Sequence, residues 1–329
     1  MNKLAFPGLG IGEFTIRDSI SVFGIFELRL YAVIIAFGMM LAVAYAFWRF
    51  HDNKIKLDTV LDYAVWVLPM SIIGARLYYV FFDMIQNPDR YFGVTVVKGK
   101  EVGSFIGFLY NVVAVWEGGL AIYGGVIAGG LTIFVISLIK KRNAMKILDI
   151  AVPAVLFAQV LGRWGNFFNV EAFGYATKLP WRMWSDSTSV KNEILSQGYT
   201  YKQYINGEVG VHPTFLYESL WNIIGVILMI GTLILTTKIL KVAEKKHING
   251  FFFAFYMIWY GFGRMFIEGL RTDSLWLIPG VIRASIFVAV LTFIAGTALM
   301  VYLLVRKKLL DKKSKQEDKK EEVKDGTNN

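Results

Sequence analysis

Seven stretches of about 20 mostly apolar residues constrain the fold of this 329-residue chain more than any other feature. A helix of that length crosses the hydrocarbon core of a bilayer. Because 55% of the residues are hydrophobic and only 18% are charged, one soluble core does not account for the composition. The sequence therefore predicts an all-α polytopic membrane protein, a bundle of seven transmembrane helices. The expected spans are residues 29–49, 59–81, 118–138, 148–168, 214–236, 250–270 and 281–305.

Lysine and arginine clusters set the expected orientation of the spans. In a seven-span arrangement these clusters all fall on one side, which the positive-inside rule makes cytoplasmic. The N-terminus is then outside, the C-terminus is cytoplasmic, and two long external loops connect spans two and three and spans four and five. Insertion topology thus explains the net charge of +10, and we expect no nucleic-acid partner. The clusters lie at 49–56, 140–146, 238–246 and 306–308, and the loops at 82–117 and 169–212.

The two ends of the chain are expected to differ from the helical bundle. Residues 1–21 lack the pattern of a removable signal peptide, and we interpret them as a short exposed lead-in to the first span. After residue 310, lysine alternates with acidic residues and apolar residues are almost absent. This pattern predicts a seven-helix membrane domain over residues 1–310 and a disordered cytoplasmic tail over 311–329. We interpret most residues of the two external loops as plain connections at the membrane interface.

Polar side chains gather near the external ends of the predicted spans. A charge within hydrocarbon costs at least about 2.5–3.5 kcal/mol, so an ionisable residue there indicates a functional site. Arg163 recurs with two asparagines at i, i+3 and i+6, and Arg264 recurs with two charged residues at i, i+4 and i+7, so each set shares a helix face. The residues expected at this level are Tyr31, Arg76, Glu117, Tyr123, Arg163, Asn166, Asn169, His212, Tyr217, Glu218, Arg264, Glu268 and Arg271.

Two arginines at one site have a clear chemical use. Their guanidinium groups can hold a phosphodiester through bidentate hydrogen bonds and stabilise the added negative charge when the phosphate leaves. Simpler interpretations stay open for individual residues. Arg76 could be an anchor that reaches the interface, Tyr123 could fill the bundle, His212 could bond at a helix entry, and the glycines of the spans could serve packing.

One motif resembles a known signature. The segment Gly162-Arg163-x-Gly165-Asn166-Phe167-x-Asn169-x-Glu171-x-x-Gly174 is similar to that of the bacterial prolipoprotein diacylglyceryl transferases. Further segments resemble the family in the same order over nearly the whole membrane region. They are Leu30-Tyr31, Gly74-Ala75-Arg76, Gly118-Gly119 with Tyr123-Gly124-Gly125, His212-Pro213-Thr214 through Leu216-Tyr217-Glu218, and Arg264 through Glu268 to Arg271.

The resemblance implies a seven-helix enzyme of the bacterial cytoplasmic membrane, with its active site near the external leaflet. Such an enzyme moves the diacylglyceryl group of phosphatidylglycerol to the thiol of the lipobox cysteine in prolipoproteins, forming a thioether and releasing glycerol 1-phosphate. This is the first step of lipoprotein maturation. Its partners are membrane lipid and prolipoprotein signal peptides, and no metal or organic cofactor is implied. The chain has no cysteine, which fits a reaction whose acceptor brings the thiol.

The resemblance also implies roles for single residues. Arg163 would bind the lipid phosphate and Arg264 would be the second essential cation. The implied catalytic residues are Arg163, Arg264, Tyr123 and Glu268, and the implied substrate-binding residues are Arg163, Asn166, Asn169, Glu171, Tyr31, Arg76, Gly174 and Arg271.

Two positions depart from the family pattern. Tyr123 stands where some members have histidine, and Phe215 stands where others have glutamine. A tyrosine, with an ordinary pKa of about 10, accepts a proton poorly at neutral pH. We therefore expect positive potential to acidify the substrate thiol, whose ordinary pKa is about 8.5, and the arginines to stabilise the departing phosphate.

Two other functions are compatible with buried polar groups. A transporter or channel for an anionic solute also uses arginine-lined cavities, but it predicts polar residues throughout the membrane rather than at one end. A non-catalytic membrane scaffold gives little reason to bury several arginines and asparagines. The sequence therefore favours the transferase.

Overall fold

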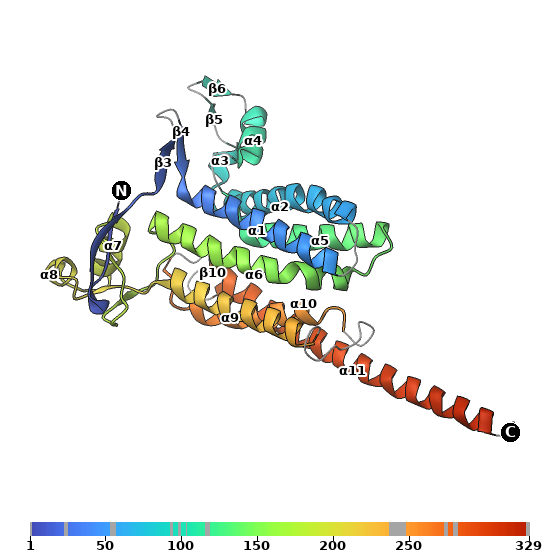
Figure 1. Ribbon diagram of the computed structural model, residues 1–329. Helices are drawn as coiled ribbons and strands as arrows, with labels where there is room; N and C mark the ends of the chain where they lie inside the picture. The colour runs from blue at the N-terminus through green and yellow to red at the C-terminus, as the bar shows by residue number, and fades with distance from the viewer. Residues whose placement is uncertain are drawn as a thin grey trace. The chain divides into compact units, whose positions relative to one another are not determined.

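The computed structural model is mostly helical (Figure 1). It describes residues 2–22, 26–52, 57–92, 95–97, 100–102, 104–115, 119–236, 248–272, 276–278 and 282–326. The chain divides into two compact units. The first unit comprises residues 1–45 and 149–329, and the second comprises residues 46–148.

Six helices of the described residues are long and apolar enough to cross a membrane, which confirms a polytopic helical protein. The seventh expected span, 250–270, coincides with α10 (Phe251–Glu268), which is 18 residues long but is not among the six. Its aromatic, glycine and charged residues reduce its hydropathy, so the count of seven spans stays a prediction. The six are α1 (Leu30–Asp52), α2 (Leu57–Gln86), α5 (Ile122–Ile139), α6 (Ala144–Asn169), α9 (Thr214–Ile234) and α11 (Ala284–Gly326).

Glycine contacts and a shared apolar core hold the helices of the first unit together. Helix α10 packs against both α9 and α11. Gly261 of α10 and Gly296 of α11 sit where an added Cβ would overlap the partner helix, so small residues permit this close approach. Helix α6 joins the group through a buried cluster with α9 and α10: Val152, Leu156, Met229 and Tyr256.

Helix α10 begins against a carboxylate of α6. Its own N-cap residue, Gly250, has a left-handed backbone with φ of 97° and offers no side-chain oxygen. Asp149 of α6 replaces that oxygen, since its carboxylate accepts from the backbone N–H of Gly250 at 2.6 Å and of Phe253 at 2.8 Å. Two backbone donors at this helix start are therefore satisfied by a side chain of another helix.

The N-terminal segment and the loop 169–212 form a small mixed α/β region within the first unit. Strand β1 (Asn2–Phe6) pairs antiparallel with β2 (Ile11–Ile16) and with β8 (Trp184–Ser185), so Leu4 lies opposite Ser185. Strand β7 (Ala176–Thr177) pairs with β9 (Gly210–Val211), beside α7 (Thr188–Ser196) and α8 (Tyr201–Ile205). Its core contains Leu4, Ala5, Ile16, Val170, Phe173, Met183, Trp184, Val190, Ile194, Tyr204, Val209, Val211 and Phe215.

The expectation of a short exposed lead-in is therefore wrong. Leu4 is fully buried and Ala5 is 4% exposed. The partners that bury them lie about 180 residues further along the chain, at β8. No local pattern in residues 1–21 announces a pairing at that separation. The loop 169–212 is likewise a packed region rather than a plain connector.

In the second unit, α2 packs along α5. Gly74 and Gly124 approach so closely that an added Cβ on either would overlap the other helix, and Tyr63 bonds Ser137 through their hydroxyls at 2.8 Å. For Gly124 this confirms the packing interpretation. The loop between the two helices contains α3 (Pro88–Phe92), β5 (Thr95–Val97), β6 (Lys100–Val102) and α4 (Ser104–Val113).

The last helix is longer than expected. The backbone of α11 continues to Gly326, through the segment from residue 311 that the charge pattern predicts to be disordered. Lysine and glutamate are good helix formers, so a helix already begun in the membrane segment can extend through them without further nucleation. The remaining short elements are η1 (Pro7–Leu9), β3 (Ser19–Val22), β4 (Phe26–Arg29), β10 (Trp276–Ile278) and β11 (Ile282–Arg283).

Candidate active site

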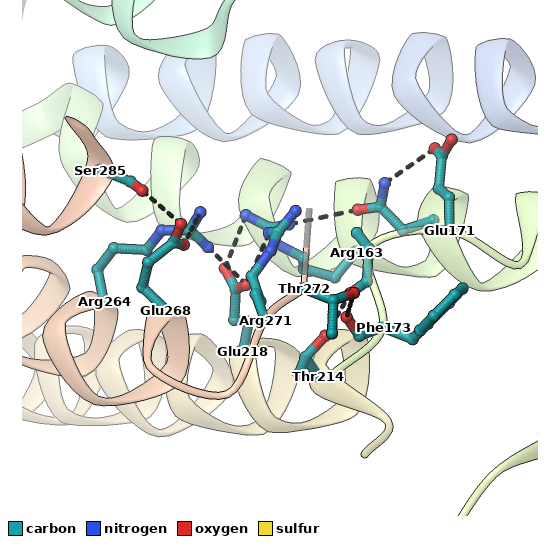
Figure 2. A network of polar contacts seen from close by, with 12 residues as sticks. Arg163, Glu171, Phe173, Thr214, Glu218, Arg264, Glu268, Arg271, Thr272 and Ser285 are labelled. Atoms are coloured by element: carbon teal, nitrogen blue, oxygen red, sulfur yellow. Dashed lines mark hydrogen bonds and ion pairs between the residues drawn. The ribbon is translucent and has the colours of Figure 1, made fainter. Parts of the chain in front are cut away.

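A single carboxylate in α9 joins three arginines of the first unit (Figure 2). Glu218 Oε2 lies 2.7 Å from an Nη atom of Arg163 in α6. Its other oxygen lies 2.6 Å from Arg264 Nη1 in α10 and 3.3 Å from Arg271 Nη1 just after α10. The Glu218 side chain is only 5% exposed, so these ion pairs are shielded from water and weakly screened.

A second carboxylate extends the cluster toward α11. Glu268 Oε2 lies 2.5 Å from Arg264 Nη2, and Ser285 at the start of α11 donates its hydroxyl to Glu268 Oε1. Arg264 therefore uses its two terminal nitrogens on two different glutamates. Such a fork holds the guanidinium plane in one orientation.

An amide relay continues from Arg163 in the opposite direction. Arg163 Nη1 donates to Asn166 Oδ1 at 3.4 Å, and Asn166 Nδ2 donates to Glu171 Oε1 at 3.0 Å. Asn169 donates to the same carboxylate oxygen at 3.1 Å. Figure 2 shows the contacts as one row from Ser285 to Glu171. The row brings together seven of the residues predicted for the site: Arg163, Asn166, Asn169, Glu171, Arg264, Glu268 and Arg271.

The ends of the helices place these side chains at a common level. Arg163 lies near the C-terminus of α6, Glu218 near the N-terminus of α9, and Arg264 near the C-terminus of α10. Ser285 lies at the start of α11. Because successive helices run in opposite directions, their alternating ends meet, as the topology predicted from the sequence requires.

Gly174 acts through its backbone. It forms a bridge with Arg271, and its N–H donates to the carbonyl of His212 at 2.9 Å. An added Cβ would overlap the carbonyl oxygen of Leu270 and crowd Thr214. The glycine thus permits the close approach that holds the chain next to Arg271.

Tyr31 of α1 packs on the signature segment. Its ring lies so close to Gly165 of α6 that a Cβ there would overlap the ring. Gly165 is therefore required by contact with Tyr31, which explains why the signature has glycine two residues after Arg163. This places Tyr31 within the same unit as the arginine cluster.

Phe215 packs in a group of aromatic side chains beside the arginine cluster. It is 4% exposed, and its ring lies 5.6 Å from Trp164 and 4.9 Å from Phe167 between centroids. Trp164 in turn donates its indole N–H to Ser219 at 3.2 Å, next to the Arg163–Glu218 pair. Phe215 is therefore a core residue that joins the helix ends to the small α/β region.

Arg76 and Tyr123 belong to the second unit. Arg76 is 4% exposed and donates to the carbonyls of Val112, Gly119 and Asn111 at 3.0, 3.1 and 2.7 Å. These bonds fasten the C-terminal end of α4, and Gly119 in the segment that follows it, to helix α2. The Tyr123 ring lies 6.5 Å from the Tyr78 ring between centroids. Their substrate-binding and catalytic roles remain predictions, and Glu117 lies outside the described residues.

His212 precedes the membrane helix α9 and contacts a tyrosine of it. Its Nδ1 is 3.0 Å from the hydroxyl of Tyr217, which also accepts from the indole N–H of Trp181 at 2.7 Å. Burial lowers the pKa of His212 below its ordinary value of 6.5. A neutral histidine that orders the start of α9 agrees with the helix-entry interpretation.

Two residues of the site gave no signal in the sequence, and a third was expected there without a role. Glu218 was placed at the right level but received no role, although it is the centre of the cluster. Ser285 and Arg283 gave no signal. Arg283 donates to the backbone carbonyls of Glu268 and Arg271 and, at 2.9 Å, to the Tyr175 hydroxyl, so it closes the C-terminal end of α10.

The arrangement can bind an anion next to an apolar surface. Three guanidiniums pair directly with two carboxylates. Arg283 and Glu171, which join the same row through other contacts, make four guanidiniums and three carboxylates, so one positive charge is in surplus among these residues. The carboxylates reduce the cost of burying the cations, and the surplus favours a phosphate. Fixed guanidiniums also stabilise negative charge that develops on a leaving group.

Comparisons with known proteins agree with this chemistry. The family model described as prolipoprotein diacylglyceryl transferase matches residues 18–302. The phosphatidylglycerol–prolipoprotein diacylglyceryl transferase of Streptococcus agalactiae serotype Ia is 38% identical over 279 residues, covering 85% of this chain and 93% of that protein. The protein of the same name from Lactobacillus delbrueckii subsp. bulgaricus is 37% identical over 290 residues, covering 87% and 90%. The chain therefore belongs to the prolipoprotein diacylglyceryl transferase family.

Proposed function

We propose that this chain transfers the diacylglyceryl group of phosphatidylglycerol to the lipobox cysteine of prolipoproteins. The names of its relatives support this substrate pair. The observation that carries the proposal is the Glu218-centred cluster of three arginines at the ends of membrane helices. A transporter for an anionic solute has no comparable support.

In the proposed reaction the cysteine thiol releases its proton to water and the sulfur attacks the glycerol carbon that carries the phosphate. A carbon–sulfur bond forms, the carbon–oxygen bond to phosphate breaks, and glycerol 1-phosphate leaves with the bonding electrons. Arg163 and Arg264 bind the phosphate and stabilise its growing charge. Positive potential around them also favours the thiolate over the thiol.

The remaining cluster residues orient these two arginines. Glu218 and Glu268 hold the Arg264 fork, while Asn166 keeps Arg163 linked to Glu171. Arg271 adds a third cation beside Glu218. Tyr31 and Gly174 shape the site. For Arg76 and Tyr123, the substrate-binding and catalytic roles that the family resemblance implies stay proposals.

We infer that the site faces the external side of the bacterial cytoplasmic membrane, with seven spans and a cytoplasmic C-terminus. Lys146 at the start of α6 and Arg306 near the middle of the long helix α11 lie roughly one span length along their helices from Arg163 and Ser285. Basic residues mark the cytoplasmic ends of spans, so their position supports a cluster near the outer leaflet. An exported cysteine and a phospholipid headgroup can meet at that level.

The test uses the purified full chain in detergent micelles with phosphatidylglycerol and a lipobox peptide. We expect thioether formation and glycerol 1-phosphate release with the cysteine peptide and none with its serine analogue. Arg163→Lys keeps the charge but loses the fork, and should lower kcat by roughly a hundredfold or more. Consumption of lipid without the peptide thiol, or a normal Arg163→Lys enzyme, would refute the proposal.

Tyr123→Phe separates two views of the proton transfer. If the arginines carry the chemistry, this variant should keep most of its activity, because only a hydroxyl is lost. A Tyr123→Phe enzyme as inactive as Arg163→Lys would instead give the hydroxyl a direct part. Both variants should unfold at the temperature of the parent protein if they report on chemistry.

A further inference from the structure

Two tryptophans join α9 to α10 in a reciprocal contact. Trp221 Nε1 of α9 donates to the backbone carbonyl of Trp259 at 3.0 Å, and Trp259 Nε1 of α10 donates to the backbone carbonyl of Trp221, also at 3.0 Å. The two indole rings stack with centroids 4.2 Å apart and planes 13° apart. Each residue is thus both donor and acceptor to the other.

A glycine four residues after each tryptophan makes room for the opposite ring. Gly225 follows Trp221 by one turn, and Gly263 follows Trp259 by the same interval. A Cβ on Gly225 would overlap the indole of Trp259, and one on Gly263 would overlap the indole of Trp221. The pattern Trp-x-x-x-Gly therefore occurs in both helices. The indole of one helix packs against the glycine of the other, so each half of the contact requires a tryptophan and a glycine.

This contact specifies the helix register better than ordinary packing does. Leucine or phenylalanine side chains can slide by part of a turn in lipid with little change in energy. An indole N–H that lost its carbonyl in hydrocarbon would be left without a partner, which costs several kcal/mol on transfer scales. Sliding α9 along α10 would break both hydrogen bonds together.

The contact adjoins the arginine cluster on both helices. Glu218 precedes Trp221 by three residues and shares its helix face, and Arg264 directly follows Gly263. The Arg264–Glu218 distance of 2.6 Å therefore depends on the same register that the two indoles fix.

We propose that Trp221 and Trp259 are positioning residues for the transferase reaction. Their reciprocal hydrogen bonds hold α9 and α10 in the register that places Glu218 against Arg264, which aligns the Arg264 guanidinium with the departing phosphate. This step rests on the function proposed above for the cluster. The indoles themselves touch neither lipid phosphate nor thiol.

The first test compares Trp221→Phe and Trp259→Phe, which keep an aromatic ring and lose the N–H. Each should lower kcat by roughly tenfold or more with little change in KM for phosphatidylglycerol, because a misaligned cation affects the transition state more than lipid binding. Loss in the double variant should be smaller than the product of the single losses, since both substitutions disrupt one coupled unit. Gly263→Ala should give the same kcat loss.

The matched controls are Gly231→Ala and Trp66→Phe. Gly231 lies further along α9 with open space at its Cβ position, and Trp66 of α2 is 61% exposed. Both variants should keep the kcat and KM of the parent. A kcat loss in the controls equal to that in the tryptophan variants would overturn the proposal.

A second measurement reports register without using activity. The chain has no cysteine, so two introduced cysteines are the only attachment points for nitroxide labels. We choose Leu220→Cys in α9 and Phe266→Cys in α10, because both side chains are exposed. The distance between the labels should shift or broaden in Trp221→Phe and in Gly263→Ala, but not in Gly231→Ala. An unchanged distance distribution would refute the register role even if activity fell. If the parent showed no transferase activity, the proposed function would fail while this measurement still decided the register.

Discussion

At the scale of single residues, the site is a row of charged and amide groups joined by ion pairs and hydrogen bonds. Asn166 shows this best, because its amide accepts from Arg163 and donates to Glu171. An amide has one end that accepts and one that donates, so its orientation is fixed by unlike neighbours. A carboxylate of the same shape could satisfy only the arginine.

Asn166→Asp tests this directional role. The new carboxylate would face Glu171 and replace a donor by a like charge, so we expect kcat/KM to fall by roughly tenfold or more. Asn206→Asp is the matched control, because Asn206 donates to Glu208 at 3.0 Å at an exposed position. That control should stay within about twofold of the parent, as exposed charge pairs contribute little. Equal effects in a lipid-peptide transfer assay would contradict the relay.

His212 gives a pH dependence of stability at the same scale. Burial lowers its pKa in the folded protein, so between that pKa and about 6.5 the unfolded chain binds more protons than the folded chain. Stability should therefore fall as the pH is lowered through 6.5, and be fully retained above it. Thermal unfolding of the parent and of His212→Gln, from pH 7.5 to 5.5, checks this. The variant should lose this part of the slope, and identical slopes would exclude His212 as its source.

At the scale of elements, polar contacts between helices determine where the helices begin and how they register. Asp149 of α6 caps α10, whereas the N-cap residue of α10 is a glycine without a side chain. The same helix ends at the arginine cluster. A looser start of α10 would therefore loosen the helix that carries Arg264 and Glu268.

Asp149→Ala should destabilise the protein by about 1–2 kcal/mol, the usual value of a helix cap. Asp149→Asn keeps one acceptor oxygen and should lose less. Asp58→Ala removes an exposed carboxylate from the first turn of α2 and serves as the control. Unfolding in detergent by denaturant compares the three, and a value for Asp149→Ala no larger than that of Asp58→Ala would disprove the capping role.

At the scale of the whole molecule, the first unit combines a helical bundle with a small α/β region that the N-terminus completes. Leu4 of β1 packs in the same core as Val211 and Phe215, and Phe215 lies in the first turn of the helix that carries Glu218. The N-terminal strand is thus coupled to the position of α9. Removing its buried side chain should affect more than the N-terminus.

Leu4→Ala should cost about 2–5 kcal/mol of stability, the usual range for a leucine truncated in a packed core. Leu9→Ala is the same substitution in the same hairpin at a position that is 54% exposed, and it should be nearly neutral. Thermal unfolding and proteolysis of the loop 169–212 measure the difference. Equal stability of the two variants would show that β1 is not part of the core.

Much of the architecture follows from sequence patterns that depend on neighbouring residues only. Apolar runs located the membrane helices, because a bilayer demands length and hydropathy that no soluble segment needs. The spacing of three or four residues puts Arg163 and Asn166 on one helix face, and Arg264 and Glu268 on another. Because successive helices run in opposite directions, these residues are expected at the same membrane level. The signature segment added the family, which the comparisons confirm.

The sequence by itself determined the helical membrane class, the family and most residues that the structure brings together in the candidate site. Only the tertiary structure decided that Glu218 is the shared partner of three arginines, that Asp149 caps α10 and that Leu4 completes a core with residues near 185 and 211. The physical reason is range: hydropathy and helix spacing are local properties. Ion pairs, caps from other helices and strand pairing depend on contacts between residues far apart in the chain.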